Sequence, residues 1–191
     1  NNEFNGADMF VGPNSYEEGR QAGDWANEKI GSGQAVIIMG LAGTDVVKNR
    51  TNGFKDALTD AASEIEVVDE QNADWDRDTA KDVCATFLKT YDDLKIVFCN
   101  NDAMALGAAT AIQTAGRVVG EDIYLLGVDA LEEAVQLVKD GEMTGTVLND
   151  HVGQSHAAVD AAIAALNGEE LQNYYWVDYV MVDKAYAEAN Y

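Results

Sequence analysis

The sequence is poor in the residue types on which several common structural chemistries depend. Its 191 residues include one proline, two cysteines and two histidines. Two cysteines are too few for a disulfide scaffold, and the spacing of Cys84 and Cys99 matches no metal or redox motif. We interpret them as buried thiols, with a local disulfide as the alternative. The histidines, His151 and His156, fall on different faces of a helix at their spacing, so they predict no metal site.

Basic residues are also scarce. Only 12 lysines and arginines stand against 34 aspartates and glutamates, which gives a formal net charge of −22. Such a chain would repel the phosphate backbone of nucleic acid and an anionic membrane surface. No stretch approaches the roughly 20 apolar residues of a transmembrane helix, and the first residues form no basic-then-apolar signal. We therefore expect no nucleic acid partner and no direct membrane insertion in this chain, and we place any targeting segment upstream.

The sequence does contain a regular alternation of apolar strands and helical segments. A short strand at Ala7–Gly12 precedes a helix from Tyr16 to Ile30, for which Ser15 and Glu18 form a capping box. Short apolar runs that need cover on both faces are typical of parallel-sheet strands. Such strands are predicted at Gln34–Met39, Glu64–Asp69, Ile96–Cys99, Ile123–Val128 and Thr144–Leu148, and a last strand at Trp176–Val182 precedes a short tail. The predicted fold class is α/β, a doubly wound parallel sheet of Rossmann-like βαβ units with no internal linker.

Polar side chains follow each of the five central strands. Open α/β sheets bind ligands just outside the carboxyl ends of their strands, so these side chains should converge on one site. Carboxylates, carboxamides and guanidinium groups can satisfy the vicinal hydroxyls of a sugar in pairs, and an indole can stack on its ring. These side chains could also have purely structural roles. Trp75 could cover the end of the sheet, Arg50 could form a surface ion pair, and Asn101, Asp102 and Asp129 could cap helices.

Several motifs, in order along nearly the whole chain, resemble those of the bacterial periplasmic sugar-binding proteins of the ribose and galactose/glucose type. The resemblance is carried by Asn100–Ala108, Leu126–Leu131, Leu137–Gly141 and Gly145–Asp150, and upstream by Gly40–Thr44 with Arg50 and Gly53-Phe54, and by Ala73–Arg77. It implies a two-lobed receptor that closes on a monosaccharide, a hexose or pentose, and delivers it to an ABC transporter permease or a chemoreceptor. It also implies an extracytoplasmic location, in the periplasm or as a cell-surface lipoprotein of a Gram-positive bacterium.

The resemblance also assigns site residues, by motif position. The expected sugar contacts are Arg50, Trp75, Asn101, Asp129 and Asn149, with Leu41 and Gly12 as weaker candidates. Within one motif, we expect Asn101 to contact the ligand and Asp102 to cap the helix that follows. No catalytic residue, cofactor or metal is expected.

The resemblance predicts how the chain divides between lobes. Residues 1–14 would be the end of an N-terminal lobe and a hinge, and residues 15–191 the C-terminal sugar-binding lobe, with helix 152–166 belonging to the N-terminal lobe. The expected crossings are at Tyr16 and its neighbours, at Asn149–Gly153, and in a segment before Trp176. The rest of the N-terminal lobe is not expected in this chain.

Two departures from the galactose/glucose type bear on the ligand. Gly31–Gln34 stands where that type has an acidic loop of the EF-hand kind, and it is too short and too poor in carboxylates to hold calcium. Thr44 and Val46 replace a His and an Asp that precede the arginine. With fewer polar partners at this position, galactose is the less expected ligand.

Other functions fit the sequence less well. An enzyme would need a nucleophile paired with a base, or metal ligands, and neither is apparent. Gly40–Thr44 lacks the lysine and the glycine spacing of nucleotide-binding loops. The serious alternative is the sugar-sensing effector domain of a LacI-type transcriptional repressor or of a membrane sensor. A repressor would need a helix-turn-helix upstream, and its body would usually be less acidic.

Overall fold

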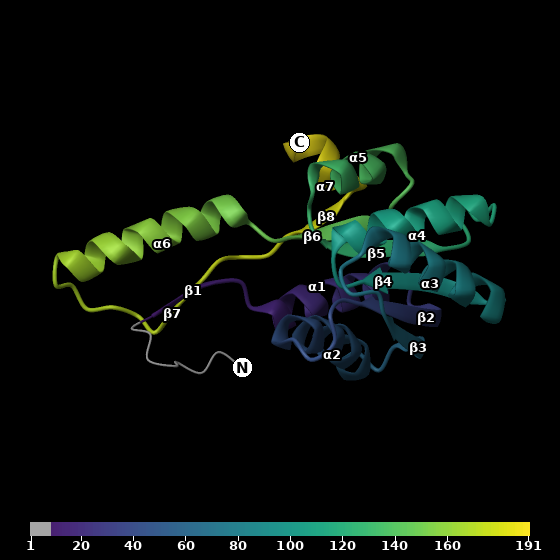
Figure 1. The fold of residues 1–191 in the computed structure, drawn as a ribbon, viewed down its shortest axis with the longest axis horizontal. Helices are drawn as coiled ribbons and strands as arrows, with labels where there is room; N and C mark the ends of the chain where they lie inside the picture. The colour runs from purple at the N-terminus through teal and green to yellow at the C-terminus, as the bar shows by residue number, and fades with distance from the viewer. Residues whose placement is uncertain (1–8) are drawn as a thin grey trace.

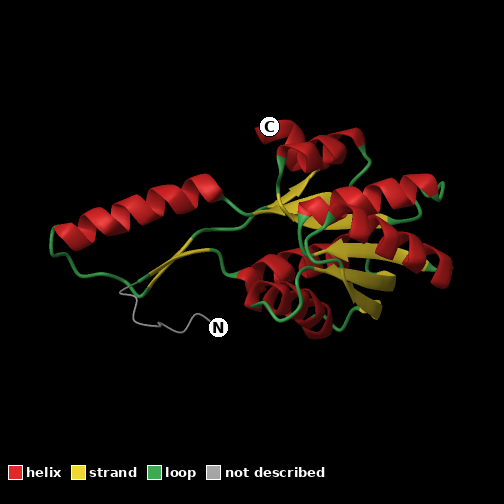
Figure 2. Ribbon diagram, viewed as in Figure 1, coloured by secondary structure: helices red, strands yellow, loops and turns green. Residues whose placement is uncertain are grey.

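A six-stranded sheet forms the centre of the molecule in the computed structural model, which describes residues 9–191. The strand order is β3-β2-β4-β5-β6-β8, and helices lie on both faces (Figures 1 and 2). The strands are β2 (Ser32–Met39), β3 (Glu64–Asn72), β4 (Leu94–Cys99), β5 (Tyr124–Asp129), β6 (Gly145–Leu148) and β8 (Met181–Asp183). All pair in parallel except β8, which runs antiparallel to β6 at the edge. The predicted α/β class and parallel sheet are confirmed.

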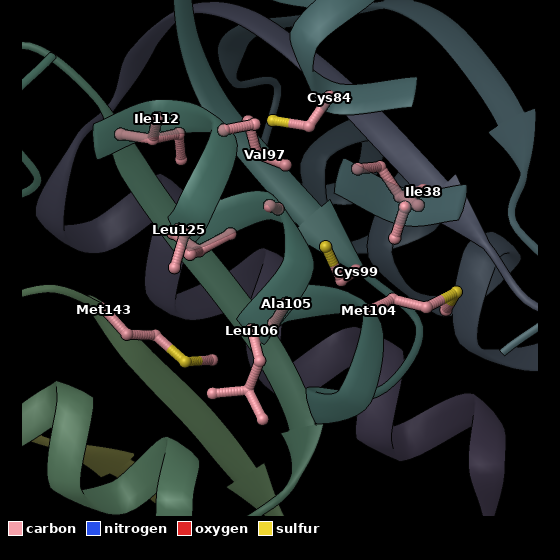
Figure 3. Close-up of a cluster of buried hydrophobic side chains, with 14 of the residues drawn as sticks. Ile38, Cys84, Val97, Cys99, Met104, Ala105, Leu106, Ile112, Leu125 and Met143 are labelled. Carbon is pink, nitrogen blue, oxygen red and sulfur yellow. The ribbon is translucent and has the colours of Figure 1, made fainter. Parts of the chain in front are cut away.

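The two faces of the sheet bury separate apolar clusters. The helices α1 (Ser15–Lys29) and α2 (Asp45–Asp60) pack on one face, where Ile37 and Phe98 point. On the other face lie α3 (Arg77–Thr90), α4 (Asp102–Thr114) and α5 (Glu132–Asp140). Successive strand residues point to opposite faces, so Ile38, Val97 and Leu125 join this second cluster (Figure 3). It also holds Cys84 and Cys99, which are free and buried, so the interpretation as buried thiols is confirmed.

Close contact between α1 and α2 depends on glycine. A Cβ atom added to Gly19 would lie 2.0 Å from the carbonyl oxygen of Arg50, and one added to Gly53 would lie 2.0 Å from that of Tyr16. Only glycine allows the two backbones to approach so closely. The residue before Gly19, Glu18, is thereby brought against Arg50.

A smaller unit lies apart from the sheet. The strand β1 (Phe10–Gly12) pairs in parallel with β7 (Tyr174–Trp176), and α6 (His151–Leu166) extends beside them, away from the sheet (Figure 1). We call β1, β7 and α6 the outer unit. The chain passes between it and the sheet at residues 13–14, 149–150 and 177–180. Only Ala161 of α6 is buried, and its large apolar residues are exposed, namely Val152, Val159, Ile163 and Leu166.

Two local predictions are wrong. The N-cap of α1 is Asn14, whose side chain accepts a hydrogen bond from the Tyr16 amide, and not Ser15. The predicted strand Trp176–Val182 is two strands in different sheets, because residues 177–180 cross from β7 to β8. The expected tail forms α7 (Lys184–Asn190), which Asp183 caps. The predicted strand Ala7–Gly12 begins at Phe10, and residues 7–8 lie outside the described part of the chain.

Candidate functional site

The candidate site lies at the carboxyl ends of the central strands. From β2 the chain goes to β3 on one side of it and then to β4 on the other, and such a reversal of direction is where α/β sheets form a ligand crevice. The Asn100 amide donates to the carbonyl oxygen of Ile38 at 2.9 Å, which joins the two strand ends. A cavity of about 300 Å³ opens here, lined by Thr44, Val46, Arg50, Trp75, Asn101 and Asp129.

Arg50 is the best-fixed side chain of the cavity. Its Nε donates to Oε2 of Glu18 at 2.7 Å, its Nη1 to the carbonyl oxygen of Asn100 at 2.6 Å, and its Nη2 to Oδ1 of Asp129 at 3.3 Å. The Glu18 side chain is fully buried and the Arg50 side chain is 6% exposed. These bonds use three of the five N–H donors of the guanidinium, which leaves two for a ligand. Arg50 is therefore a buried, pre-oriented donor, and the interpretation as a surface ion pair is wrong.

Asp129 ends β5 in an unusual backbone conformation. Its φ is +122°, and that of Ala130 is +56°, both in the region that favours glycine. The Asp129 side chain remains 24% exposed at the cavity. Burial raises the pKa of this carboxyl, and the charge of Arg50 opposes the rise. Asp129 thus offers the cavity a carboxylate that Arg50 holds in place from one side.

Trp75 lies across the end of the sheet and also lines the cavity. The indole covers Gly40, where an added Cβ would lie 2.3 Å from its Cε2 and Cζ2 atoms. Asp74 and Trp75 both have positive φ, +52° and +67°, and Asp76 then caps α3 through its bond with the Thr79 amide. Consecutive non-glycine residues in the left-handed region of φ are strained, and they persist where the surrounding structure holds them. The side chain therefore covers the end of the sheet and also lines the cavity, and its stacking on a ligand stays a prediction.

The roles predicted within the Asn101-Asp102 pair are partly wrong. Asn101 is the N-cap of α4, and its Oδ1 accepts from the Met104 amide at 3.0 Å. Its side chain nevertheless lines the cavity, so its contact with a ligand stays a prediction. Asp102 is not the cap, because it lies in the first turn with its side chain directed into the core. There it accepts from the Thr146 hydroxyl and the Leu131 amide.

The other candidates lie outside the cavity lining. The backbone amide of Asn149 donates to the carbonyl oxygen of Asp129 at 3.4 Å, and its side-chain oxygen accepts from Gln154. Leu41 is 49% exposed beside the site, and Gly12 lies in β1 of the outer unit. The structure therefore brings together four of the five principal candidates, and it joins Asn149 to one of them, Asp129, through a backbone hydrogen bond.

Glu18, which holds Arg50 in the candidate site, was not predicted from the sequence. The capping-box pattern assigned its carboxylate to the start of α1, whereas the side chain reaches across to Arg50 in α2. A signal was present in the sequence. Glu18 precedes Ala22 and Ala26 at intervals of four residues, so it falls on the buried face of its own helix.

Across residues 9–191, no group of three or more His, Cys, Asp or Glu side chains could hold a metal ion. Within the same range, no helix combines the length and the apolar character needed to cross a membrane.

Comparison with known proteins agrees with this geometry. Residues 3–170 match the family described as the periplasmic binding protein domain. The ribose import binding protein RbsB of Salmonella typhimurium is 38% identical over 169 residues, which are 87% of this chain and 55% of that protein. A periplasmic solute binding protein of an ABC transporter from Actinobacillus succinogenes 130z, solved with bound D-allose, is 29% identical with a TM-score of 0.87, over 95% of this chain and 63% of that one. A periplasmic ribose ABC transporter structure from Conexibacter woesei shares the fold, with a TM-score of 0.90 at 22% identity. The chain thus spans between 55% and 63% of the length of the first two relatives.

Proposed function

Because the chain belongs to the family of periplasmic binding proteins, we propose that it forms the sugar-binding part of an extracytoplasmic receptor. The receptor would bind a monosaccharide without catalysis and present it to an ABC transporter permease or a chemoreceptor. The observation that carries this proposal is the cavity at the reversal of the sheet, where a buried arginine, a carboxylate, a carboxamide and an indole converge. The first two of these are joined by a partly buried ion pair, and Arg50 is held in turn by the buried Glu18.

The donor and acceptor balance of the cavity suits a neutral polyol. A sugar hydroxyl can accept from the guanidinium of Arg50 while it donates to the carboxylate of Asp129. The carboxamide of Asn101 adds donors, because only its oxygen is engaged in capping α4. The indole of Trp75 offers an apolar plane to the ring C–H groups. These four side chains can therefore bind both the edge and the face of a pyranose or furanose ring.

The apolar part of the lining favours particular sugars. Val46 is 39% exposed beside the cavity, and Thr44 directs its hydroxyl to the carbonyl oxygen of Leu41 at 2.9 Å. Neither side chain offers a charged or bidentate partner to a hydroxyl on that side of the ligand. The proposed ligand is therefore a pentose or hexose of the ribose and allose kind, which are the sugars named in two of the relatives, with galactose less favoured.

We propose that the outer unit is part of a second lobe that closes over the sugar. Support comes from α6, whose four large apolar residues on one side of the helix are at least half exposed, and from relatives that extend well beyond this chain. The three connections at residues 13–14, 149–150 and 177–180 would then act as the hinge. Asn149 belongs to one of these connections, so a sugar contact from it would depend on closure.

A titration of the protein that contains this chain and both lobes tests the proposal. D-ribose, D-allose and D-galactose would be added while Trp75 fluorescence and calorimetric heat are followed, with D-ribose 5-phosphate as an anionic control. Ribose or allose should bind, and Arg50→Lys should weaken binding at least tenfold because the bidentate fork is lost. Arg20→Lys, on the partly exposed α1–α2 ion pair, is the matched control and should bind as the wild type does. Absence of sugar binding, or equal effects of the two substitutions, would contradict the proposal.

A further inference from the structure

We propose that Asp102 and Thr146 are positioning residues, which hold the turn Asp129–Leu131 and so direct the Asp129 carboxylate toward Arg50 and the ligand. The consequence for sugar affinity rests on the proposed function. The geometric part, that these two side chains fix the turn, stands independently of which ligand is bound. Neither residue belongs to the cavity lining.

The turn that they hold needs external support. Asp129 and Ala130 are consecutive non-glycine residues with φ values of +122° and +56°. A non-glycine residue with such a φ is strained and persists only when its surroundings enforce that conformation. Released from those surroundings, the turn would move toward ordinary backbone angles. The Asp129 carboxylate, which accepts from Arg50 at 3.3 Å, would then lose its fixed direction.

The two side chains hold this turn through successive backbone amides. The Ala130 amide donates to Oγ1 of Thr146 at 3.2 Å, and the Leu131 amide donates to Oδ2 of Asp102 at 2.8 Å. The Thr146 hydroxyl in turn donates to Oδ1 of Asp102 at 2.7 Å. Both oxygens of the carboxylate and both functions of the hydroxyl are thus engaged in one connected network.

The absence of a side chain at Gly127 makes room for this network in the core. Asp102 and Thr146 are fully buried, and Gly127 of β5 lies opposite Thr146 in the sheet. A Cβ atom on Gly127 would lie 2.3 Å from Oδ1 of Asp102. The strand therefore carries no side chain at the point where the carboxylate passes toward β6. A buried carboxylate is costly unless its hydrogen bonds are satisfied, and here its two partners are the Thr146 hydroxyl of β6 and the Leu131 amide of the turn.

Amide hydrogen exchange tests the geometric part without any ligand. In the full-length protein, Thr146→Val keeps the shape of the side chain but removes the acceptor for the Ala130 amide. The Ala130 and Leu131 amides should exchange at least tenfold faster, while amides of α2 keep their rates. Thr146→Ser, which restores the hydroxyl, should return both rates to near the wild-type values. Thr146→Ala replaces the valine variant if the latter does not fold. Unchanged exchange at Ala130 and Leu131 would overturn the proposal.

A double-mutant cycle tests the consequence for binding, with D-ribose and D-allose as the probes. Thr146→Val should weaken sugar binding about tenfold in the wild-type background and by less than twofold in the Asp129→Asn background, because its effect passes through Asp129. Thr146→Ser should restore affinity. Equal losses in both backgrounds would show a general structural role and contradict the proposal. If neither sugar binds the wild type, the proposed function fails, and the exchange result still decides whether the turn is held as described.

Discussion

The ion pair between Glu18 and Arg50 should contribute far more to stability than the other ion pair that joins the same two helices. Both pairs connect α1 to α2 at 2.7 Å. The side chains of Glu18 and Arg50 are 0% and 6% exposed, whereas those of Arg20 and Asp60 are 23% and 65% exposed. The two pairs therefore form a matched comparison in which burial is the principal difference.

The perturbation is Glu18→Gln, which keeps the shape of the side chain and one acceptor for Arg50 Nε. Breaking a buried ion pair by removing one partner costs about 3–5 kcal/mol. Asp129 still faces the guanidinium, and the amide oxygen can still accept, so we expect a smaller loss of about 2–3 kcal/mol. Asp60→Asn should cost less than about 1 kcal/mol, because exposed pairs are screened by water and salt.

Urea unfolding near neutral pH measures both variants. A loss of 2–3 kcal/mol lowers the midpoint by about 1 M or more for typical slopes, provided that the slope itself does not change. High salt, which shortens the screening length to about 3 Å at 1 M, should remove most of the Asp60→Asn effect and leave that of Glu18→Gln. If both substitutions lower the midpoint equally, or if salt removes both effects, the assignment of Glu18 as a buried anchor is wrong.

Three other predictions concern the turn and the outer unit. Burial raises the pKa of Asp102 from 3.8 to about 7, so its stabilising contribution is present below about pH 4 and is lost as the pH rises through about 7. Urea unfolding measures the free energy of unfolding of Asp102→Asn relative to that of the wild type. This difference should shift by about 2–3 kcal/mol in favour of the variant between about pH 5 and pH 8, and a difference that does not change with pH would refute the prediction. Gly127→Ala should lower thermal stability by about 1–3 kcal/mol through overpacking, and an unchanged melting temperature would contradict the packing argument. Val159→Asp combined with Ile163→Asp should destabilise a protein with both lobes but leave the 191-residue chain unchanged, and equal effects in both would exclude α6 as a lobe contact.

The gathering of Arg50, Trp75, Asn101 and Asp129 could be predicted from sequence because it follows from topology. Each residue comes shortly after an apolar strand, and parallel strands have their carboxyl ends at one edge of the sheet. The order of elements predicts that side chains after the strands share one edge, and the family resemblance selects these four among them by motif position. The same two arguments also selected Asn149, which lies outside the cavity lining.

The partners of these residues could not be predicted in the same way, because they depend on contacts distant in sequence. The Glu18–Arg50 pair joins residues 32 apart, and the bond from Thr146 to Asp102 joins residues 44 apart. Local patterns pointed elsewhere in both places. Ser15 and Glu18 match a capping box, and Asp102 stands one residue from the true cap. In each case burial in the tertiary structure overrode a local hydrogen-bonding preference.

The charge balance around Arg50 narrows the kind of ligand that the proposed function allows. Glu18 and Asp129 place two carboxylates on one guanidinium, which leaves one negative charge in excess within a chain of net charge −22. An anionic ligand such as a sugar phosphate or sugar acid would have to displace Asp129 from Arg50 and would face uncompensated repulsion in a partly buried site. A neutral sugar avoids this, since each hydroxyl can donate to Asp129 and accept from Arg50 without breaking their contact. The arginine of this site is therefore suited to orienting hydroxyls rather than to neutralising an anion.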